Sequence, residues 1–187
     1  MNESPDRGAV LVAIAREAIG ERLGVAAARE HGEPWLARPA ATFVTLRLEE
    51  ALRGCIGSID PRRPLGEDVA GNARAAAFSD PRFEPLDADE FAVVSVEVSV
   101  LSPRTPLVVA SEEEAARRLR PGVDGVYLEY RGLAATFLPQ VWESIPDPFE
   151  FLAALRGKAR LPARFWDPAI RLTRYTVEKY VDGCPAH

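Results

Sequence analysis

The sequence is poor in cysteine and lysine and has no long apolar run. Its two cysteines, Cys55 and Cys184, are too few and too far apart for a disulfide framework, so reduced thiols are expected. Lys158 and Lys179 are the only lysines among 23 basic residues, and this arginine bias alone indicates no function. No apolar run approaches the roughly 18 residues that a membrane-spanning helix needs, so no membrane association is expected.

Concentrated positive charge is also missing. The net charge of -5 and the isoelectric point near 5.2 speak against a nucleic-acid-binding surface, because phosphate affinity depends on clustered basic side chains. Residues 1–8 (MNESPDRG) lack the charged-then-apolar order of a signal peptide, which predicts a cytoplasmic protein. Glycine-rich nucleotide-binding loops and the G-x-S-x-G pattern of serine hydrolases are absent, so these classes receive no support.

What is present is typical of one globular domain with a sizeable core, since 47% of the 187 residues are hydrophobic and 27% are charged. Helical spacing of Leu11, Ile14 and Ala18 predicts a first helix with Asp6 as its N-cap. A second helix is predicted over residues 64–77, because proline suits the first turn of a helix.

Alternating apolar and polar residues predict three strands in the first half. Residues 42–50 and 52–59 alternate in this way and are separated by a short break, which indicates a hairpin. In residues 91–101 four valines alternate with Ser95, Glu97 and Ser99, which predicts a strand with one buried face and one polar face.

The second half predicts a smaller group of helices and strands. Ser111 and Glu114 have the spacing of a helix start, and Asp147 begins a second helix. Residues 126–140 predict two strands that turn at Arg131-Gly132, and residues 170–180 predict a final strand.

This order of elements predicts an α+β fold with a mostly antiparallel sheet flanked by helices and a second, smaller α+β lobe. We expect a single domain over residues 1–187. Its larger lobe would comprise about residues 1–110 and the C-terminal strand, and its smaller lobe about residues 111–165.

The segment LRGCIGSID, residues 52–60, is the main candidate for a functional site. Arg53 and Cys55 are two positions apart on a predicted strand, so their side chains are expected on one face, where the guanidinium would favour the thiolate. Gly54 and Gly57 would let a substrate approach the backbone, and their amides could stabilise a developing negative charge. Cys55 could equally be a small buried apolar residue, and the glycines could mark a bulge.

A base for the thiol is not obvious. Of the two histidines, His31 is in a loop and His187 is the last residue, so Glu97 on the polar strand face is the better proton acceptor. Asp80 and Arg82 could orient a polar substrate, although a turn residue and a surface ion pair would explain them as well.

The C-terminal segment CPAH offers at most half of a metal site. Cys184 and His187 have a spacing found in zinc sites, but no second pair of ligands accompanies them. A frayed terminus explains this segment more simply, so no metal site is predicted.

Several motifs in order resemble a known family. They are LRGCIGSI at 52–59, PLGEDVAGNARAAAF at 64–78, DPRFEPL at 80–86, VSVEVSVLS at 94–102, ATFLPQVW at 135–142 and FLAALRGKA at 151–159. Together they resemble the AMME chromosomal-region domain family, protein A of the AmmeMemoRadiSam system. The resemblance implies a two-lobed α+β fold, with a Memo-like protein and a radical SAM protein as expected partners.

The match to the family hallmark R-G-C-I-G is complete over residues 53–57, with two departures elsewhere. Ala51 replaces the usual glycine before the hallmark, and Arg160 replaces the glycine of the usual K-A-G-L. The first departure leaves the turn geometry open, and the second argues against close backbone approach near residue 160.

From these observations we expect an enzyme or enzyme subunit that acts on a small polar or anionic substrate. Cys55 would be the nucleophile or a ligand to the substrate, Arg53 the anion anchor and thiolate stabiliser, and Glu97 the proton acceptor. The remaining candidates would bind substrate: Gly54, Gly57, Asp80, Arg82 and Gln140. The alternative is a non-catalytic binding or adaptor module for a protein partner or metabolite, and the sequence names no cofactor for either.

Overall fold

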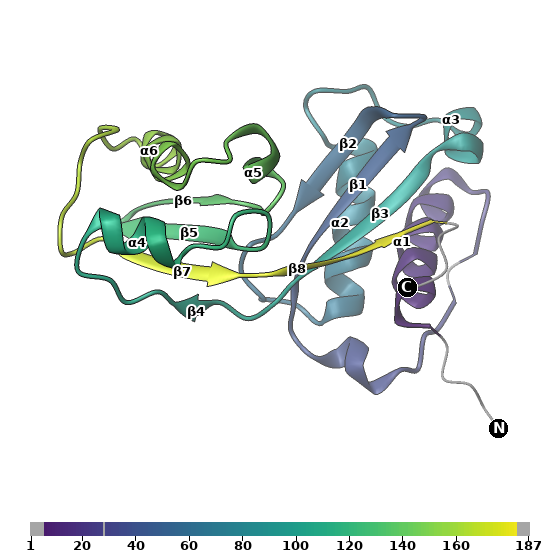
Figure 1. The fold of residues 1–187 in the computed structure, drawn as a ribbon. Helices are drawn as coiled ribbons and strands as arrows, with labels where there is room; N and C mark the ends of the chain where they lie inside the picture. The colour runs from purple at the N-terminus through teal and green to yellow at the C-terminus, as the bar shows by residue number, and fades with distance from the viewer. Residues whose placement is uncertain (1–5, 28, 183–187) are drawn as a thin grey trace. The chain divides into compact units, whose positions relative to one another are not determined.

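The computed structural model describes residues 6–27 and 29–182, which form two compact units (Figure 1). The first unit runs to Leu101 and resumes at Glu178, and the second comprises residues 102–177. Each unit has its own four-stranded sheet and its own hydrophobic core. Together they confirm the predicted α+β class, because the pairings within both sheets are antiparallel.

The sheet of the first unit has the strand order β2-β1-β3-β8. Its strands are β1 (Ala41–Leu48), β2 (Ala51–Gly57), β3 (Ser95–Leu101) and β8 (Val177–Val181). Strands β1 and β2 form the predicted hairpin, and Glu49 adopts a positive φ of 53° in the turn between them.

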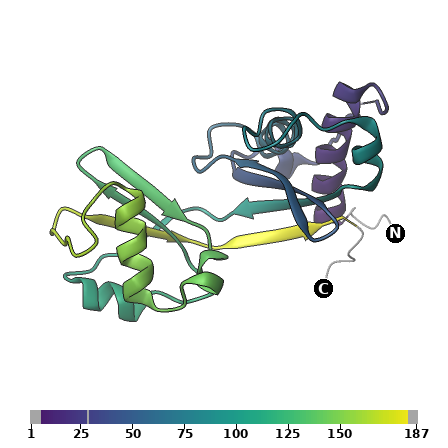
Figure 2. The same cartoon turned by 90° about the horizontal axis from the view of Figure 1, so that it is seen from above.

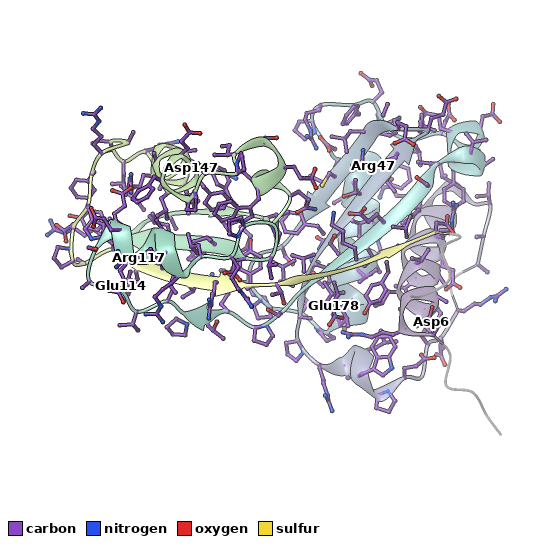
Figure 3. The ribbon with its side chains drawn as sticks, in the orientation of Figure 1. Asp6, Arg47, Glu114, Arg117, Asp147 and Glu178 are labelled. Atoms are coloured by element: carbon purple, nitrogen blue, oxygen red, sulfur yellow. The ribbon has the colours of Figure 1, made fainter. Side chains whose placement is uncertain are left out.

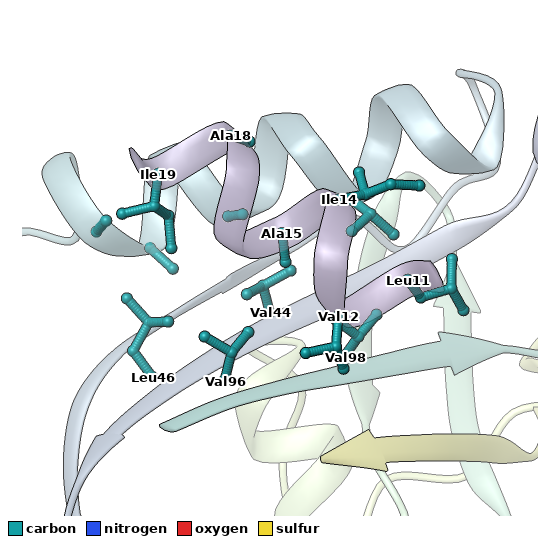
Figure 4. Close-up of a cluster of buried hydrophobic side chains, with 14 of the residues drawn as sticks. Leu11, Val12, Ile14, Ala15, Ala18, Ile19, Val44, Leu46, Val96 and Val98 are labelled. Atoms are coloured by element: carbon teal, nitrogen blue, oxygen red, sulfur yellow. The ribbon is translucent and has the colours of Figure 1, made fainter. Parts of the chain in front are cut away.

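Two helices, α1 (Arg7–Leu23) and α2 (Leu65–Phe78), pack against this sheet, and both confirm the predicted helices. The Asp6 side chain caps α1 by accepting a hydrogen bond from the amide of Gly8. Apolar side chains of α1 meet those of β1 and β3 in the core (Figure 4). The labelled members are Leu11, Val12, Ile14, Ala15, Ala18, Ile19, Val44, Leu46, Val96 and Val98.

The predicted strand over residues 91–101 is wrong at its beginning. Residues Ala88–Val93 form a short helix, α3, whose start is a capping box between Asp87 and Glu90. This local capping outweighs the β propensity of the residues that follow, and β3 begins only at Ser95. The segment before β1 also contains a short helical turn, η1 (Pro34–Ala37).

The sheet of the second unit has the order β4-β7-β5-β6. Its strands are β4 (Thr105–Pro106), β5 (Gly125–Tyr130), β6 (Leu133–Phe137) and β7 (Arg171–Tyr175). Positive φ values at Arg131 and Gly132 form the predicted turn between β5 and β6. Because β4 already pairs with β7, the chain enters the second unit before the boundary expected near residue 110.

Three helices belong to the second unit: α4 (Glu112–Arg118), α5 (Val141–Ser144) and α6 (Pro148–Lys158). Ser111 and Asp147 cap α4 and α6 as predicted, and Asp147 is labelled at the start of α6 in Figure 3. Apolar residues of α4 and α6 pack on one face of the sheet, along which α6 lies in Figure 2.

The predicted final strand is two strands in two different sheets. Strand β7 ends at Tyr175 and β8 begins at Val177, and between them the carbonyl of Thr176 accepts a hydrogen bond from the amide of Ser102.

Among the described residues, no helix combines the length and the apolar character that crossing a membrane requires. Cys184 and His187 lie outside the described residues.

Candidate functional site

A β-bulge shapes the segment that carries Cys55. Strand β2 is an edge strand, and its register against β1 shifts so that Gly54 faces Leu46 whereas Leu52 faces Arg47. Arg53 is therefore the extra residue of the bulge. Bulges redirect the side chains of the strand that contains them, so simple alternation fails at Arg53.

The Arg53 guanidinium is held by the segment that leads into α3. Its Nε and Nη2 donate to the Glu90 carboxylate over 2.8 and 2.6 Å, and Nη2 also donates to the Glu84 carbonyl over 2.9 Å. The hydrogen bond to Glu90 raises the pKa of Arg53, and the same bond lowers the pKa of Glu90. The charge partner of Arg53 is thus Glu90, whereas the sequence pointed to Cys55.

Cys55 is partly exposed and is anchored through its backbone. Its amide donates to Oδ2 of Asp80 over 2.9 Å, and its carbonyl accepts from Nη2 of Arg82 over 3.3 Å. Its sulfur accepts a hydrogen bond of 3.4 Å from the Thr45 hydroxyl on the neighbouring strand. The side chains of Asp80 and Arg82 therefore satisfy backbone groups that an edge strand otherwise leaves open.

Asp80 and Arg82 form a bidentate ion pair beside Cys55. Arg82 donates to the two carboxylate oxygens over 2.9 and 2.7 Å, and the Asp80 side chain is only 2% exposed. The hydrogen bonds from Arg82 and the amide of Cys55 hold the pKa of Asp80 far below its usual 3.8, although burial opposes them. The hydrogen bond to Asp80 raises the pKa of Arg82, although burial opposes it. Arg82 is thus the guanidinium bound to Cys55, through the Cys55 carbonyl.

An aromatic ring connects the two arginines. The Cζ atoms of Arg53 and Arg82 lie 5.7 and 5.5 Å from the ring centroid of Phe83, within the range of cation–π contacts. No sequence pattern indicated that Phe83 or Thr45 would lie at this site. Thr45 could have been found, because it is the residue opposite Cys55 in the predicted hairpin.

Glu97 lies in the same cross-strand row as Cys55 but not beside it. Thr45 pairs with Cys55 on one side and with Glu97 on the other, so two strand spacings, about 10 Å, separate Cys55 from Glu97. The Glu97 carboxylate accepts a hydrogen bond from Ser99 and lies 3.9 Å from Nζ of Lys179. At this separation, proton transfer from the thiol to Glu97 would require a bridging group.

The two glycines that flank Cys55 have close packing neighbours. A Cβ atom on Gly54 would lie 2.2 Å from the Ala76 carbonyl oxygen of α2, and one on Gly57 would lie 2.2 Å from the Phe43 ring. Both positions require glycine for packing, independently of any substrate.

Gln140 belongs to the second unit, where it precedes α5 and has a buried Oε1 without a hydrogen-bond partner among the described residues. The first unit contains Arg53, Cys55, Asp80 and Arg82, so Gln140 is not in the same unit as these candidates. In the part of the chain that the structure describes, no group of three potential metal ligands is found.

Comparisons with known proteins agree with this architecture. The AMMECR1 family matches residues 12–180. The chain belongs to the AMMECR1 family. A protein from Methanothermobacter thermautotrophicus is 40% identical, with 94% of each chain covered. One from Thermofilum pendens is 35% identical, with 97% of this chain and 92% of the relative covered.

A solved structure supports the AMMECR1 fold of this chain. The crystal structure of an uncharacterised protein from Pyrococcus horikoshii is similar, with a TM-score of 0.82 and 34% sequence identity. The similarity covers 95% of this chain and 92% of that one. The predicted family resemblance is thereby confirmed.

Proposed function

We propose that this AMMECR1 chain is an enzyme or enzyme subunit that acts on a small polar or anionic substrate at Cys55. The observation that carries the proposal is that Cys55 is partly exposed, that its sulfur accepts a hydrogen bond from the Thr45 hydroxyl, and that the Arg82 guanidinium is bound to its carbonyl. A hydrogen-bond donor and a cation both stabilise a thiolate, which is the nucleophilic form of cysteine.

Unused guanidinium nitrogens support an anionic substrate. Nε and Nη2 of Arg82 are bound to Asp80 and Cys55, whereas Nη1 has no hydrogen-bond acceptor among the described residues. Nη1 of Arg53 is likewise without an acceptor in the described parts, and it is buried. A substrate carboxylate or phosphate would bind first at Arg82, whose side chain is 52% exposed and already oriented by Asp80.

Glu97 would act as the proton acceptor at a distance. Thr45 lies between Glu97 and Cys55 in the cross-strand row, so its hydroxyl or a water molecule would relay the proton. Under this proposal Thr45 both holds the sulfur and links it to the carboxylate.

A second candidate is a non-catalytic binding or adaptor module. The amide of Cys55 is already bound to Asp80, and the space beside Gly54 and Gly57 is filled by packing. This observation favours binding without a covalent step, because it leaves the segment few backbone donors for an oxyanion. In either case we propose a cytoplasmic protein that works with a Memo-like protein and a radical SAM protein, as the family resemblance suggests.

The proposal is tested by alkylating Cys55 with iodoacetate, which is anionic, and with iodoacetamide, which is neutral. A Cys184→Ser background makes Cys55 the single thiol. Arg82→Gln should lower the ratio of the iodoacetate rate to the iodoacetamide rate about fivefold, as expected for loss of about 1 kcal/mol of ion pairing. Arg62→Gln is the matched control, because its side chain is 82% exposed and contacts Asp60. An unchanged ratio in Arg82→Gln, or an inert Cys55, would contradict the proposal.

A second experiment separates an enzyme from a binding module. Cys55→Ser should fold and retain a Memo-like partner in a pull-down under both hypotheses. Comparison of metabolites from cells with wild-type and Cys55→Ser protein then decides, because only an enzyme predicts accumulation of a substrate in the variant.

A further inference from the structure

A groove in the first unit lies apart from the residues of the Cys55 site. Its volume is about 750 Å³, and it runs between residues 29–37 and the first half of α2. Part of its lining is apolar and includes Pro34, Leu36 and Ala70. Sites for small molecules commonly have volumes of about 300–1,000 Å³ and combine an apolar lining with a few oriented polar groups.

Arg63 is one such oriented group. Its Nε and Nη2 donate to Oδ1 of Asp68 over 3.1 and 2.8 Å, and the Asp68 side chain is only 1% exposed. The other oxygen of Asp68 accepts hydrogen bonds from Thr42, Ser58 and Asn72, which fixes the carboxylate. The guanidinium is therefore held in place before any ligand binds.

One nitrogen of this anchored guanidinium remains available. Nη1 of Arg63 has no acceptor within residues 6–27 and 29–182, and it lies against α2, where a Cβ atom on Gly71 would be 2.6 Å away. Both residues line the groove. A carboxylate in the groove would find in Nη1 a donor whose orientation costs little additional entropy.

Glu33 supplies the opposite charge. It lines the groove, and its Oε2 is buried without a hydrogen-bond donor in the described parts of the chain. A buried acceptor without a donor is unfavourable, and a ligand ammonium group would supply the missing donor.

The charges of the lining are mixed, which bears on the class of ligand. The lining contains three arginines and two glutamates: Arg29, Arg63, Arg74, Glu33 and Glu67. Its one histidine, His31, is paired with Glu17. A lone anion or a lone cation would meet repulsion as well as attraction here, whereas a ligand with both charges matches the lining.

We propose that this groove binds a free α-amino acid with an apolar side chain. The carboxylate binds Nη1 of Arg63, the ammonium group binds Glu33, and the side chain lies on the apolar lining at Leu36. This inference is independent of the function proposed for Cys55.

Titration calorimetry of the whole chain with three related compounds tests the proposal. L-leucine carries both charges, 4-methylpentanoate lacks the ammonium group, and 3-methylbutylamine lacks the carboxylate. Saturable binding of L-leucine is expected, and each analogue should bind at least about tenfold more weakly because one charged contact is lost. No saturable binding of L-leucine up to about 10 mM, or equal binding of the analogues, overturns the proposal.

Variants assign the two contacts without disturbing buried Asp68. Glu33→Gln should weaken L-leucine about tenfold and leave 4-methylpentanoate unchanged, because only the ammonium contact is altered. Gly71→Ala should weaken both compounds, because the new methyl group displaces Nη1 of Arg63. Arg62→Gln, beside Arg63 but outside the lining, is the control, and thermal melting confirms that each variant folds. Unchanged affinity of L-leucine in Glu33→Gln also overturns the proposal.

Discussion

The amide of Cys55 donates a hydrogen bond of 2.9 Å to a carboxylate oxygen of Asp80, a side chain that is 2% exposed. Because β2 is an edge strand, Asp80 takes the place of a backbone acceptor that a further strand would otherwise supply to the Cys55 amide. Arg82 completes the arrangement by donating to the Cys55 carbonyl. The backbone of the candidate nucleophile is thus fixed, while its side chain remains partly exposed.

Asp80→Asn should destabilise the first unit at neutral pH. The substitution removes the charge that Arg82 and the Cys55 amide both satisfy, and loss of charge-assisted hydrogen bonds costs about 1–3 kcal/mol. Urea unfolding at pH 7 measures the change. An unfolding free energy equal to that of the wild type would show that the ion pair contributes nothing.

The effect of Asp80→Asn should also depend on pH in one direction. The folded-state pKa of Asp80 is depressed below its ordinary 3.8, so its contribution is fully present above about pH 4 and is lost as the pH falls through the folded-state value. The difference in unfolding free energy between wild type and Asp80→Asn should therefore shrink below pH 4. A difference that stays constant down to pH 2 would contradict the depressed pKa.

Gly54→Ala should destabilise the protein by about 1–3 kcal/mol, the range typical of overpacking in a filled core. Its new Cβ would lie 2.2 Å from the backbone oxygen of Ala76, which cannot move without displacing α2. Urea unfolding measures this, with Gly66→Ala as the matched control. Gly66 is within α2, and a Cβ there would make only an ordinary contact of 3.6 Å with Leu36, so the control should be neutral or up to about 1 kcal/mol more stable. Equal stability of the two variants would contradict the packing role of Gly54.

Local sequence patterns predicted most of the helices and strands, because alternation and helix capping each depend on residues that are close in sequence. Alternation placed β1 and β2, and capping by Asp6 and Asp147 placed the starts of α1 and α6. The beginning of β3 was missed because the capping box at Asp87 outweighs strand propensity over the next few residues.

The candidate site was only partly predictable, because a bulge breaks the periodicity on which the prediction rested. Arg53 was expected beside Cys55 by alternation, but the bulge gives it Glu90 as a partner instead. Asp80 and Arg82 were named from the sequence, yet their contact with the Cys55 backbone depends on how the loop after α2 folds back onto β2. No local sequence pattern predicts that this loop packs against β2.

A double-mutant cycle tests whether Arg53 belongs mainly to Glu90. Unfolding free energies of Arg53→Gln, Glu90→Gln and the double variant should give a coupling of about 1.5–3 kcal/mol, because the hydrogen bonds are charged and the Arg53 side chain is 11% exposed. The control cycle on Arg7 and Glu178, whose side chains are 44% and 61% exposed, should give at most about 1 kcal/mol.

The same Arg53→Gln variant also separates the two arginines in their effect on the thiol. Arg82 is hydrogen-bonded to the Cys55 carbonyl, whereas the described polar contacts of Arg53 are with Glu90 and Glu84. Alkylation of Cys55 by iodoacetamide at pH 7 should therefore slow more in Arg82→Gln than in Arg53→Gln. A larger loss in Arg53→Gln, together with weak coupling to Glu90, would make Arg53 the thiolate stabiliser after all. The side-chain direction that the bulge gives Arg53 would then be incorrect, because a guanidinium held by Glu90 would not have its main effect on the sulfur.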